Sequence, residues 1–236
     1  MPMKHKNLVL LGTSHIARQS IKEVEEAVKK EKPDIIALEL DKKRLAAMLE
    51  KKRPKLRLRD IKRVGIKGFL FSVIGAWAEK KLGEKTGVKP GDEMKKAYEL
   101  ARENKIEFAM IDQDIEVTLR KISRKLTWRE KLNFVADVFK AVVLRKREVI
   151  FDLSKVPSER VIKKLTSKVR KRYPHIYEVL VEERNMIMAR NIAKLCKRNP
   201  GKKVLAIIGA GHEKEILGIV KEEQKKPSIS YSITTG

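Results

Sequence analysis

Two histidines of this 236-residue chain follow short apolar runs that end in glycine. His15 lies three residues after Gly12, near the start of the chain, and His212 lies three residues after Gly209, near its end. Neutral imidazole is a common ligand of divalent metal ions, and water bound to such an ion can attack a carbonyl near neutral pH. The two Gly-x-x-His motifs therefore make a metal-dependent hydrolase the first hypothesis, although either histidine alone is more simply a loop residue.

Carboxylates follow two further apolar runs. Glu39 is embedded near the end of the second run, and Asp112 follows the third. Two imidazoles and one carboxylate form a familiar ligand set that leaves positions for water and substrate. We therefore name His15, His212 and Glu39 as candidate metal ligands. Asp112 has three alternatives, namely a fourth ligand, a residue that orients a ligand, or the general base.

Two arginines are candidates for holding a carboxylate or an oxyanion, because a guanidinium group forms paired hydrogen bonds with such groups. Arg44 lies about one helical turn past Glu39, although this spacing also suits an ordinary surface arginine. Arg184 lies inside a predicted helix, directly after Glu183. Adjacent residues of a helix do not face each other, so these two side chains cannot pair, and each must face either solvent or the cleft.

These residues need a scaffold that brings distant parts of the chain together. The apolar runs have the length and the glycine boundaries of buried parallel strands, and helical patterns follow them. In an open α/β sheet the carboxyl ends of the parallel strands meet at one edge, where ligands bind. We therefore expect an α/β fold with a mixed, mainly parallel central sheet flanked by helices. The four expected strands cover about residues 7–11, 34–40, 106–111 and 204–208.

Helical patterns divide the chain further. Asp41, Asp92 and Thr127 are placed to cap helices. Helices are predicted at about 18–30, 128–147, 158–169, 175–197 and 212–223, with others after Asp41 and Asp92. The expected organisation is one α/β domain over 1–224 with two large additions and a tail. These are a basic and apolar insertion or lid at about 54–90, a helical subdomain at about 118–199 inserted before the last core strand, and a C-terminal strand or tail at 225–236.

The apolar segment 65–78 follows a basic linker at 54–63. It is too short to cross a bilayer and contains several glycines. Three uses are open for it: a lid over the site, a homodimer surface, or a helix in the membrane interface with flanking lysines on lipid phosphates. Packing on the domain as an inserted helix is the simpler alternative.

The composition restricts the classes of partner. The chain has a net charge of +25, with 37% charged and 42% apolar residues. Such a charge attracts polyanions, including an anionic membrane surface. Nucleic acid is disfavoured, because no recognition motif occurs and aromatic residues, at 5%, are too few for a stacking platform.

The apolar runs also bear on location. None approaches the length of about eighteen residues that a membrane span needs, and the N-terminal run is too short for a signal peptide. We expect the chain as given to be cytoplasmic, and to be membrane-associated if the native chain continues into C-terminal transmembrane helices. Its one cysteine, Cys196, excludes an internal disulfide and a cysteine-based metal cluster. The helical pattern around Cys196 predicts a buried side chain.

Several catalytic templates are absent from the sequence, including His-Glu-x-x-His, the phosphate loop and the Gly-x-Ser-x-Gly elbow. A collinear set of motifs instead resembles the TraB/PrgY group within the TIKI and GumN superfamily, over roughly residues 7–220. The motifs are Gly-Thr-Ser-His at 12–15, Leu-Glu-Leu at 38–40 with Arg44 after it, Pro-Gly-Asp-Glu-Met at 90–94, Ile-Asp-Gln-Asp-Ile at 111–115 with Thr118 and Arg120, Glu-Glu-Arg-Asn at 182–185 with Met188 and Ala189, and Gly-Ala-Gly-His at 209–212.

The resemblance implies an α/β domain in which two Gly-x-x-His motifs and an acidic residue bind a divalent metal, with manganese, cobalt or zinc as candidates. It implies metal-dependent hydrolysis of a peptide or protein substrate, as in the TIKI branch, and control of a peptide pheromone, as in the TraB/PrgY branch. A non-catalytic peptide-binding protein or a membrane-associated regulatory protein is the alternative. The roles carry over to His15, Glu39, Arg44, Glu183, Arg184 and His212.

Two departures from the family pattern matter. Gln113 stands where an arginine is usual in the Asp-x-Asp segment, which weakens a role for that loop. Archaeal and bacterial members commonly continue into C-terminal membrane helices, and this sequence ends at Gly236 without them, which leaves a truncated or a stand-alone form open.

Overall fold

The computed structural model describes residues 2–13, 18–50, 62, 65, 91–143 and 159–226. Within these residues one sheet has the strand order β1-β2-β5-β3-β4. The strands β2 (Leu8–Thr13), β5 (Val204–Gly209), β3 (Ile35–Leu38) and β4 (Glu107–Met110) run parallel to one another, and β1 (Met3–His5) pairs with β2 in the antiparallel sense. The expected mixed, mainly parallel sheet is therefore confirmed, with β1 as an edge strand that the apolar pattern did not predict.

Three sequence predictions concern residues outside those that the structure describes. They are His15, the insertion at 54–90 apart from residues 62 and 65, and the tail beyond Lys226.

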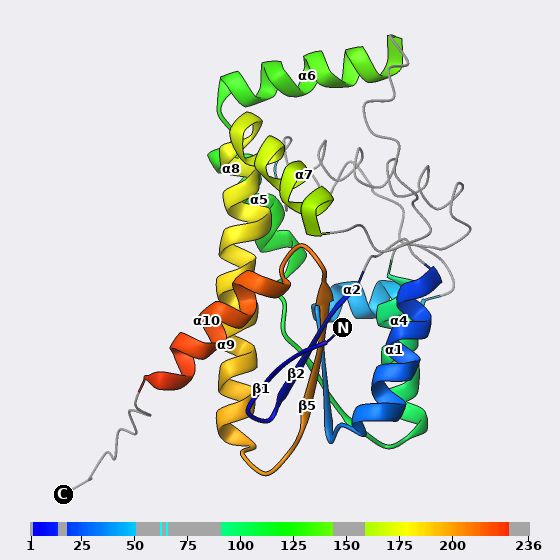
Figure 1. Ribbon diagram of the computed structural model, residues 1–236. Helices are drawn as coiled ribbons and strands as arrows, with labels where there is room; N and C mark the ends of the chain where they lie inside the picture. Colours follow the sequence, from blue (N-terminus) through cyan, green and yellow to red (C-terminus); the bar gives the residue numbers. More distant parts are fainter. Residues whose placement is uncertain are drawn as a thin grey trace, which may run out of the picture.

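Helices cover both faces of the sheet (Figure 1). On one face lie α1 (Arg18–Glu31) and α4 (Asp92–Glu103), packed on alternate strand residues such as Val9 and Leu205. On the other face lie α9 (Glu183–Arg198) and α10 (Glu213–Lys225), packed on a second set of residues. That set includes Leu8, Leu10, Ala206 and Ile208. Burial on both faces explains why β2 and β5 read as continuous apolar runs without polar alternation.

Two helix starts illustrate how local sequence sets the elements. The Asp41 carboxylate accepts hydrogen bonds from the amides of Lys43 and Arg44, so it caps α2 (Lys42–Leu49) as predicted. The prediction that Asp92 caps α4 is wrong. Gly91 holds the cap position at a φ of 90°, which glycine adopts without strain, and Asp92 is already the first helical residue. There its charge suits the helix macrodipole.

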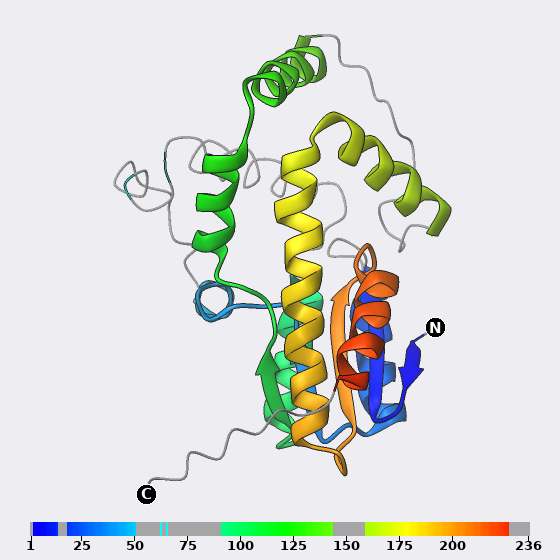
Figure 2. The same cartoon turned by 90° about the vertical axis from the view of Figure 1, so that its left-hand side faces the viewer.

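Where the structure describes the segment between β4 and β5, at 111–143 and 159–203, the chain is mainly helical, as expected for the inserted block (Figure 2). It contains α5 (Ile115–Lys125), α6 (Trp128–Val143), α7 (Glu159–Arg172), α8 (Pro174–Tyr177) and the π-helical turn η2 (Glu178–Glu182), which leads directly into α9. Thr127 and Glu130 form the predicted capping box of α6 through reciprocal hydrogen bonds. The helix predicted at 175–197 is interrupted in the structure by the π-helical turn η2, which lies between α8 and α9. Turns of this kind often lie next to functional residues.

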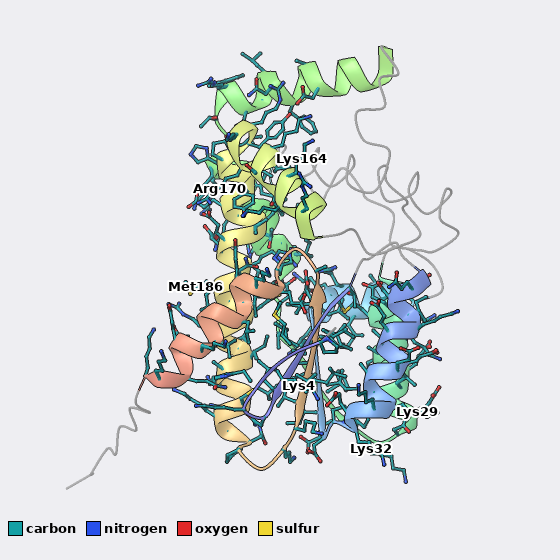
Figure 3. The ribbon with its side chains drawn as sticks, in the orientation of Figure 1. Lys4, Lys29, Lys32, Lys164, Arg170 and Met186 are labelled. Carbon is teal, nitrogen blue, oxygen red and sulfur yellow. The ribbon has the colours of Figure 1, made fainter. Side chains whose placement is uncertain are left out.

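The described helices include none long and apolar enough for a membrane span. Basic side chains instead spread over the outside of the molecule. Figure 3 shows Lys29 and Lys32 at one end of the α1 region and Lys164 on α7; Arg170, also on α7, pairs with Glu182 and lies over the ring of Tyr177. These four basic side chains are exposed.

Candidate functional site

Glu39 follows the last residue of β3 at the carboxyl edge of the sheet. Its amide donates to the carbonyl of Ile207, which extends the pairing with β5 by one residue. Its side chain is only 2% exposed, and Oε2 accepts a hydrogen bond from the amide of Gly209 at 2.6 Å. The glycine that ends β5 therefore donates its backbone amide to the predicted acid on the neighbouring strand.

Arg184 joins Glu39 to Asp112. One terminal nitrogen of its guanidinium lies 2.5 Å from Glu39 Oε1 and 2.7 Å from Asp112 Oδ2, and Nε donates to Asp112 Oδ1 at 3.1 Å. Burial by itself lowers the pKa of Arg184, but the charge of Glu39 and the hydrogen bond to Asp112 outweigh it and raise the pKa above its usual range. The paired bonds to Asp112 have the fork geometry that suits arginine and carboxylate.

Arg44 completes this group from the other side. Its Nη1 donates to Asp112 Oδ2 at 3.2 Å and to the carbonyl of Glu39 at 3.4 Å. We call Glu39, Arg44, Asp112 and Arg184 the edge cluster. The structure brings these four predicted site residues together although they are up to 145 positions apart in the chain.

His212 lies next to the edge cluster, at the residue before α10. Its Nε2 is 3.9 Å from Glu39 Oε1, and its Nδ1 is 2.5 Å from Oδ1 of Asn185. The amide nitrogen of Asn185 donates to Glu215 Oε2 at 2.6 Å. His212 is thus held between a carboxylate of the edge cluster and a side chain of α9.

Glu183 points away from this site. Its carboxylate lies 2.5 Å from Lys121 Nζ and 2.6 Å from Lys125 Nζ, both on α5. Burial alone would raise the pKa of Glu183, but the two lysines outweigh it and lower the pKa. The structure therefore does not bring Glu183 to the edge cluster, although its neighbour Arg184 belongs to it.

β2, the strand before His15, ends next to the end of β5, the strand before His212. Thr13, the last residue of β2, pairs with Gly209 at the end of β5. His15 itself lies outside the described residues. Within the described part of the chain, no cluster of three or more acidic, histidine or cysteine side chains has the arrangement of a metal site.

The donor types of Glu39 and His212 nevertheless fit a divalent ion. Two atoms that share one ion at about 2.1 Å lie about 3.0–3.4 Å apart for ligand angles of about 90–109°. The observed separation of 3.9 Å exceeds this by less than an ångström. A bound ion would share the Glu39 carboxylate with Arg184. The positive charge of Arg184 would weaken the attraction between the ion and this carboxylate.

Sequence reasoning did not assign a role to Asn185 or Glu215. The signal for Asn185 was available, because positions 185, 189, 193 and 196 lie on one face of α9, and the last three are apolar. Figure 2 shows α9 extending past the carboxyl edge of the sheet, and its buried face continues there with Asn185. The partners of Asn185 on other elements could not be read from this pattern.

A cleft of about 950 Å³ opens beside the loops that follow β2 and β5. Its wall includes Gly12, Gly211, Glu213 and Glu215, together with residues of α1 and α7. Burial raises the pKa of Glu213, whose carboxylate accepts a hydrogen bond from the Gly12 amide. The cleft therefore borders the loop of His212, through Gly211, and the side chain of Glu215, which accepts the hydrogen bond from Asn185.

Comparison with known proteins agrees with this architecture. The model of the TraB/PrgY/gumN family matches residues 3–228. An uncharacterized protein of Methanocaldococcus jannaschii is 33% identical over 250 aligned positions, which cover 98% of this chain and 61% of that protein. A TraB domain-containing protein of Bos taurus is 20% identical over 228 positions, which cover 86% of this chain and 59% of that protein. The chain thus spans about three fifths of the length of these two curated relatives.

Proposed function

The chain belongs to the TraB/PrgY/gumN family, and on that premise we propose that it is a metal-dependent hydrolase with a peptide or protein substrate. The observation that carries the proposal is the approach of His212 to Glu39 at the carboxyl edge of the sheet. The two arginines of the edge cluster lie beside this pair. An imidazole, a buried carboxylate and cationic donors are the groups that metal-assisted hydrolysis of a carbonyl compound requires.

Each residue has a distinct part in this proposal. Glu39 and His212 hold a divalent ion, of manganese, cobalt or zinc, together with His15 from the loop after β2. When bound, the ion supplies an acidified water and polarises the substrate carbonyl. Arg44 and Arg184 offer N–H donors to a substrate carboxylate or to the developing oxyanion.

Asp112 acts as a residue that orients the others. Both its oxygens accept hydrogen bonds, from Arg184, from Arg44 and from the amide of Gln113. This environment suits a carboxylate that holds two guanidinium groups in place better than one that takes a proton from water. Glu183 has no direct part, because its lysine partners hold it on α5.

The cleft and the surface charge support the choice of a peptide substrate near a membrane. The cleft of about 950 Å³ is large enough for a short peptide and borders the loop of His212 through Gly211, although its wall includes neither His212 nor a residue of the edge cluster. The net charge of +25 suits work near an anionic membrane surface, and we place the activity in peptide or signal control at such a surface. A homodimer remains part of this proposal only through the segment 65–78, which lies outside the described residues except for Gly65.

The test measures metal and turnover separately. Purified protein is titrated with Mn²⁺, Co²⁺ and Zn²⁺ by calorimetry, and hydrolysis of a fluorogenic peptide library is followed with and without chelator. We expect binding of one ion per chain, and its loss in His212→Ala and in Glu39→Gln. His175→Ala is the matched control, because His175 pairs with Glu130 on α6, away from the edge cluster.

The outcomes separate the proposal from its alternative. Absence of ion binding in the wild type would contradict the metal-dependent activity. Peptide binding without turnover, at full metal occupancy, would favour the non-catalytic peptide-binding protein. Equal loss of metal in His175→Ala would show that the effect comes from damage to the fold.

A further inference from the structure

We propose that Asn185 and Glu215 fix the tautomer of His212, so that Nδ1 carries the proton and Nε2 presents its electron pair toward Glu39. The significance of this inference rests on the proposed function, since it identifies which ring nitrogen serves the site. The tautomer itself follows from hydrogen-bond chemistry alone. Asn185 is therefore a positioning residue, and it has no direct contact with a reacting group.

The argument starts at Glu215. A glutamate carboxylate at neutral pH accepts hydrogen bonds and donates none. Oε2 of Glu215 lies 2.6 Å from the side-chain amide of Asn185, so the group that faces it must be the NH2 of Asn185. The reverse orientation would place two acceptor oxygens at that distance. Glu215 therefore determines which way the amide of Asn185 points.

The second step passes from Asn185 to His212. With its NH2 turned to Glu215, Asn185 presents its carbonyl oxygen to Nδ1 of His212 at 2.5 Å. An oxygen at that distance requires a donor, so Nδ1 must carry the proton. A neutral imidazole has one protonated nitrogen, and Nε2 is then the nitrogen with the available electron pair. This nitrogen is the one that lies 3.9 Å from Glu39 Oε1.

Burial of Asn185 makes a wrong orientation of its amide costly. Asn185 is 1% exposed, so water has little access to replace a badly oriented partner on its amide. The residue lies on α9 and Glu215 lies on α10, and these two helices pack against each other beside β2 and β5. Glu215 also lies in the first turn of α10, where the helix macrodipole favours a negative charge. The helix pair thus holds the donor and the acceptor in register.

The test reads the tautomer directly. The chain contains 4 histidines, so a long-range ¹H–¹⁵N correlation spectrum of ¹⁵N-histidine-labelled protein is simple to assign, with His212→Gln identifying the relevant ring. The metal-free protein is measured at alkaline pH, where imidazole is neutral. We expect Nε2 of His212 at the shift of an unprotonated nitrogen and Nδ1 at the shift of a protonated one. The opposite pattern, or averaged shifts, in the wild type would overturn the inference.

Two variants test the cause. Asn185→Leu removes the acceptor of Nδ1, and Glu215→Met removes the group that orients Asn185. In each we expect the two ¹⁵N shifts of His212 to move toward each other, as the tautomers mix. Glu222→Met is the matched control, because Glu222 is also an exposed glutamate of α10, and its shifts should match the wild type. Unchanged shifts in Asn185→Leu would contradict the role of Asn185.

The result is separable from the proposed function. If the protein binds a divalent ion, Asn185→Leu should weaken the affinity about 10- to 100-fold, the usual effect of removing a partner that orients a histidine ligand. If the tautomer is as expected and no ion binds, the hydrolase proposal fails and the inference about Asn185 stands. If an ion binds and the wild-type ring carries its proton on Nε2, the inference fails alone.

Discussion

Replacement of Arg184 by methionine tests whether the edge cluster is held by one buried cation. The Arg184 side chain is 14% exposed, and the carboxylates of Glu39 and Asp112 that it joins are 2% and 3% exposed. Methionine keeps much of the length and removes the charge. The two carboxylates would keep backbone amides and Arg44 as partners, but they would lose the shared guanidinium.

The magnitude follows from this burial. Removing one partner of a buried ion pair costs about 3–5 kcal/mol, because the remaining charge stays out of water without compensation. Since single domains are stable by about 5–15 kcal/mol, the loss is a large share of the total. We therefore expect Arg184→Met to lower the free energy of unfolding by about 3–5 kcal/mol.

The assay is urea unfolding followed by far-ultraviolet circular dichroism, with Arg190→Met as the control. Arg190 lies on the same helix, is 60% exposed, and pairs with Glu223 through Nε at 3.6 Å. An exposed pair of this kind contributes about 0–1 kcal/mol. A cost for Arg184→Met no greater than that for Arg190→Met would refute the reasoning.

A double-mutant cycle identifies the source of the cost. If the penalty comes from the stranded charge of Glu39, then Glu39→Gln should cost less in the Arg184→Met background than in the wild type. Additive costs would mean that the two side chains stabilise the fold independently, against the contact between them.

Three further predictions concern the stability of the fold. A Cβ on Gly12 would lie 2.7 Å from Oε2 of Glu213, at the end of a flexible side chain, and 3.1 Å from the backbone Cα of Ala210, so Gly12→Ala should cost about 1 kcal/mol. Gly218→Ala on α10, where no atom lies within 4 Å, should stabilise the protein by up to about 1 kcal/mol. Equal effects in urea unfolding would contradict this contrast. Thr127→Ala removes the cap of α6 and should cost about 1 kcal/mol in the same assay, and no loss would exclude a stabilising cap. Burial raises the pKa of Cys196 to about 11. The raised value favours the folded protein while the thiol stays protonated, so stability should fall as pH rises from the unfolded value of about 8.5 toward 11. Cys196→Ala should abolish this part of the pH dependence, and an identical dependence in both proteins would contradict it.

The strands and the positions of the residues that follow them were predictable because they depend on local pattern. The apolar runs at 7–11 and 204–208 have the length of strands buried on both faces, and β2 and β5 occupy them. Since parallel strands share one carboxyl edge, the residues after them had to come near each other. This reasoning placed Glu39, Asp112 and His212 in one neighbourhood.

Helix starts were predictable where no neighbouring residue competed for the cap position. Asp41 and Thr127 cap helices as expected. Asp92 does not. Gly91 holds the cap position in a left-handed conformation, so the helix starts one residue closer to the N-terminus than predicted. The π-helical turn at Glu178–Glu182 had no counterpart in the pattern, since an i, i+3, i+4 repeat does not distinguish it from an α-helix.

The sequence by itself determined the fold class, the shared edge of the sheet and the types of chemical group that gather there, because these follow from hydrophobic periodicity and strand direction. Only the tertiary structure decided how the groups pair. Whether Arg184 or Glu183 faces the site depends on how α9 is rotated against the sheet, and the contact of Asn185 with His212 depends on the packing of α9 against α10. Such choices come from the packing of elements distant in sequence, which no local pattern contains.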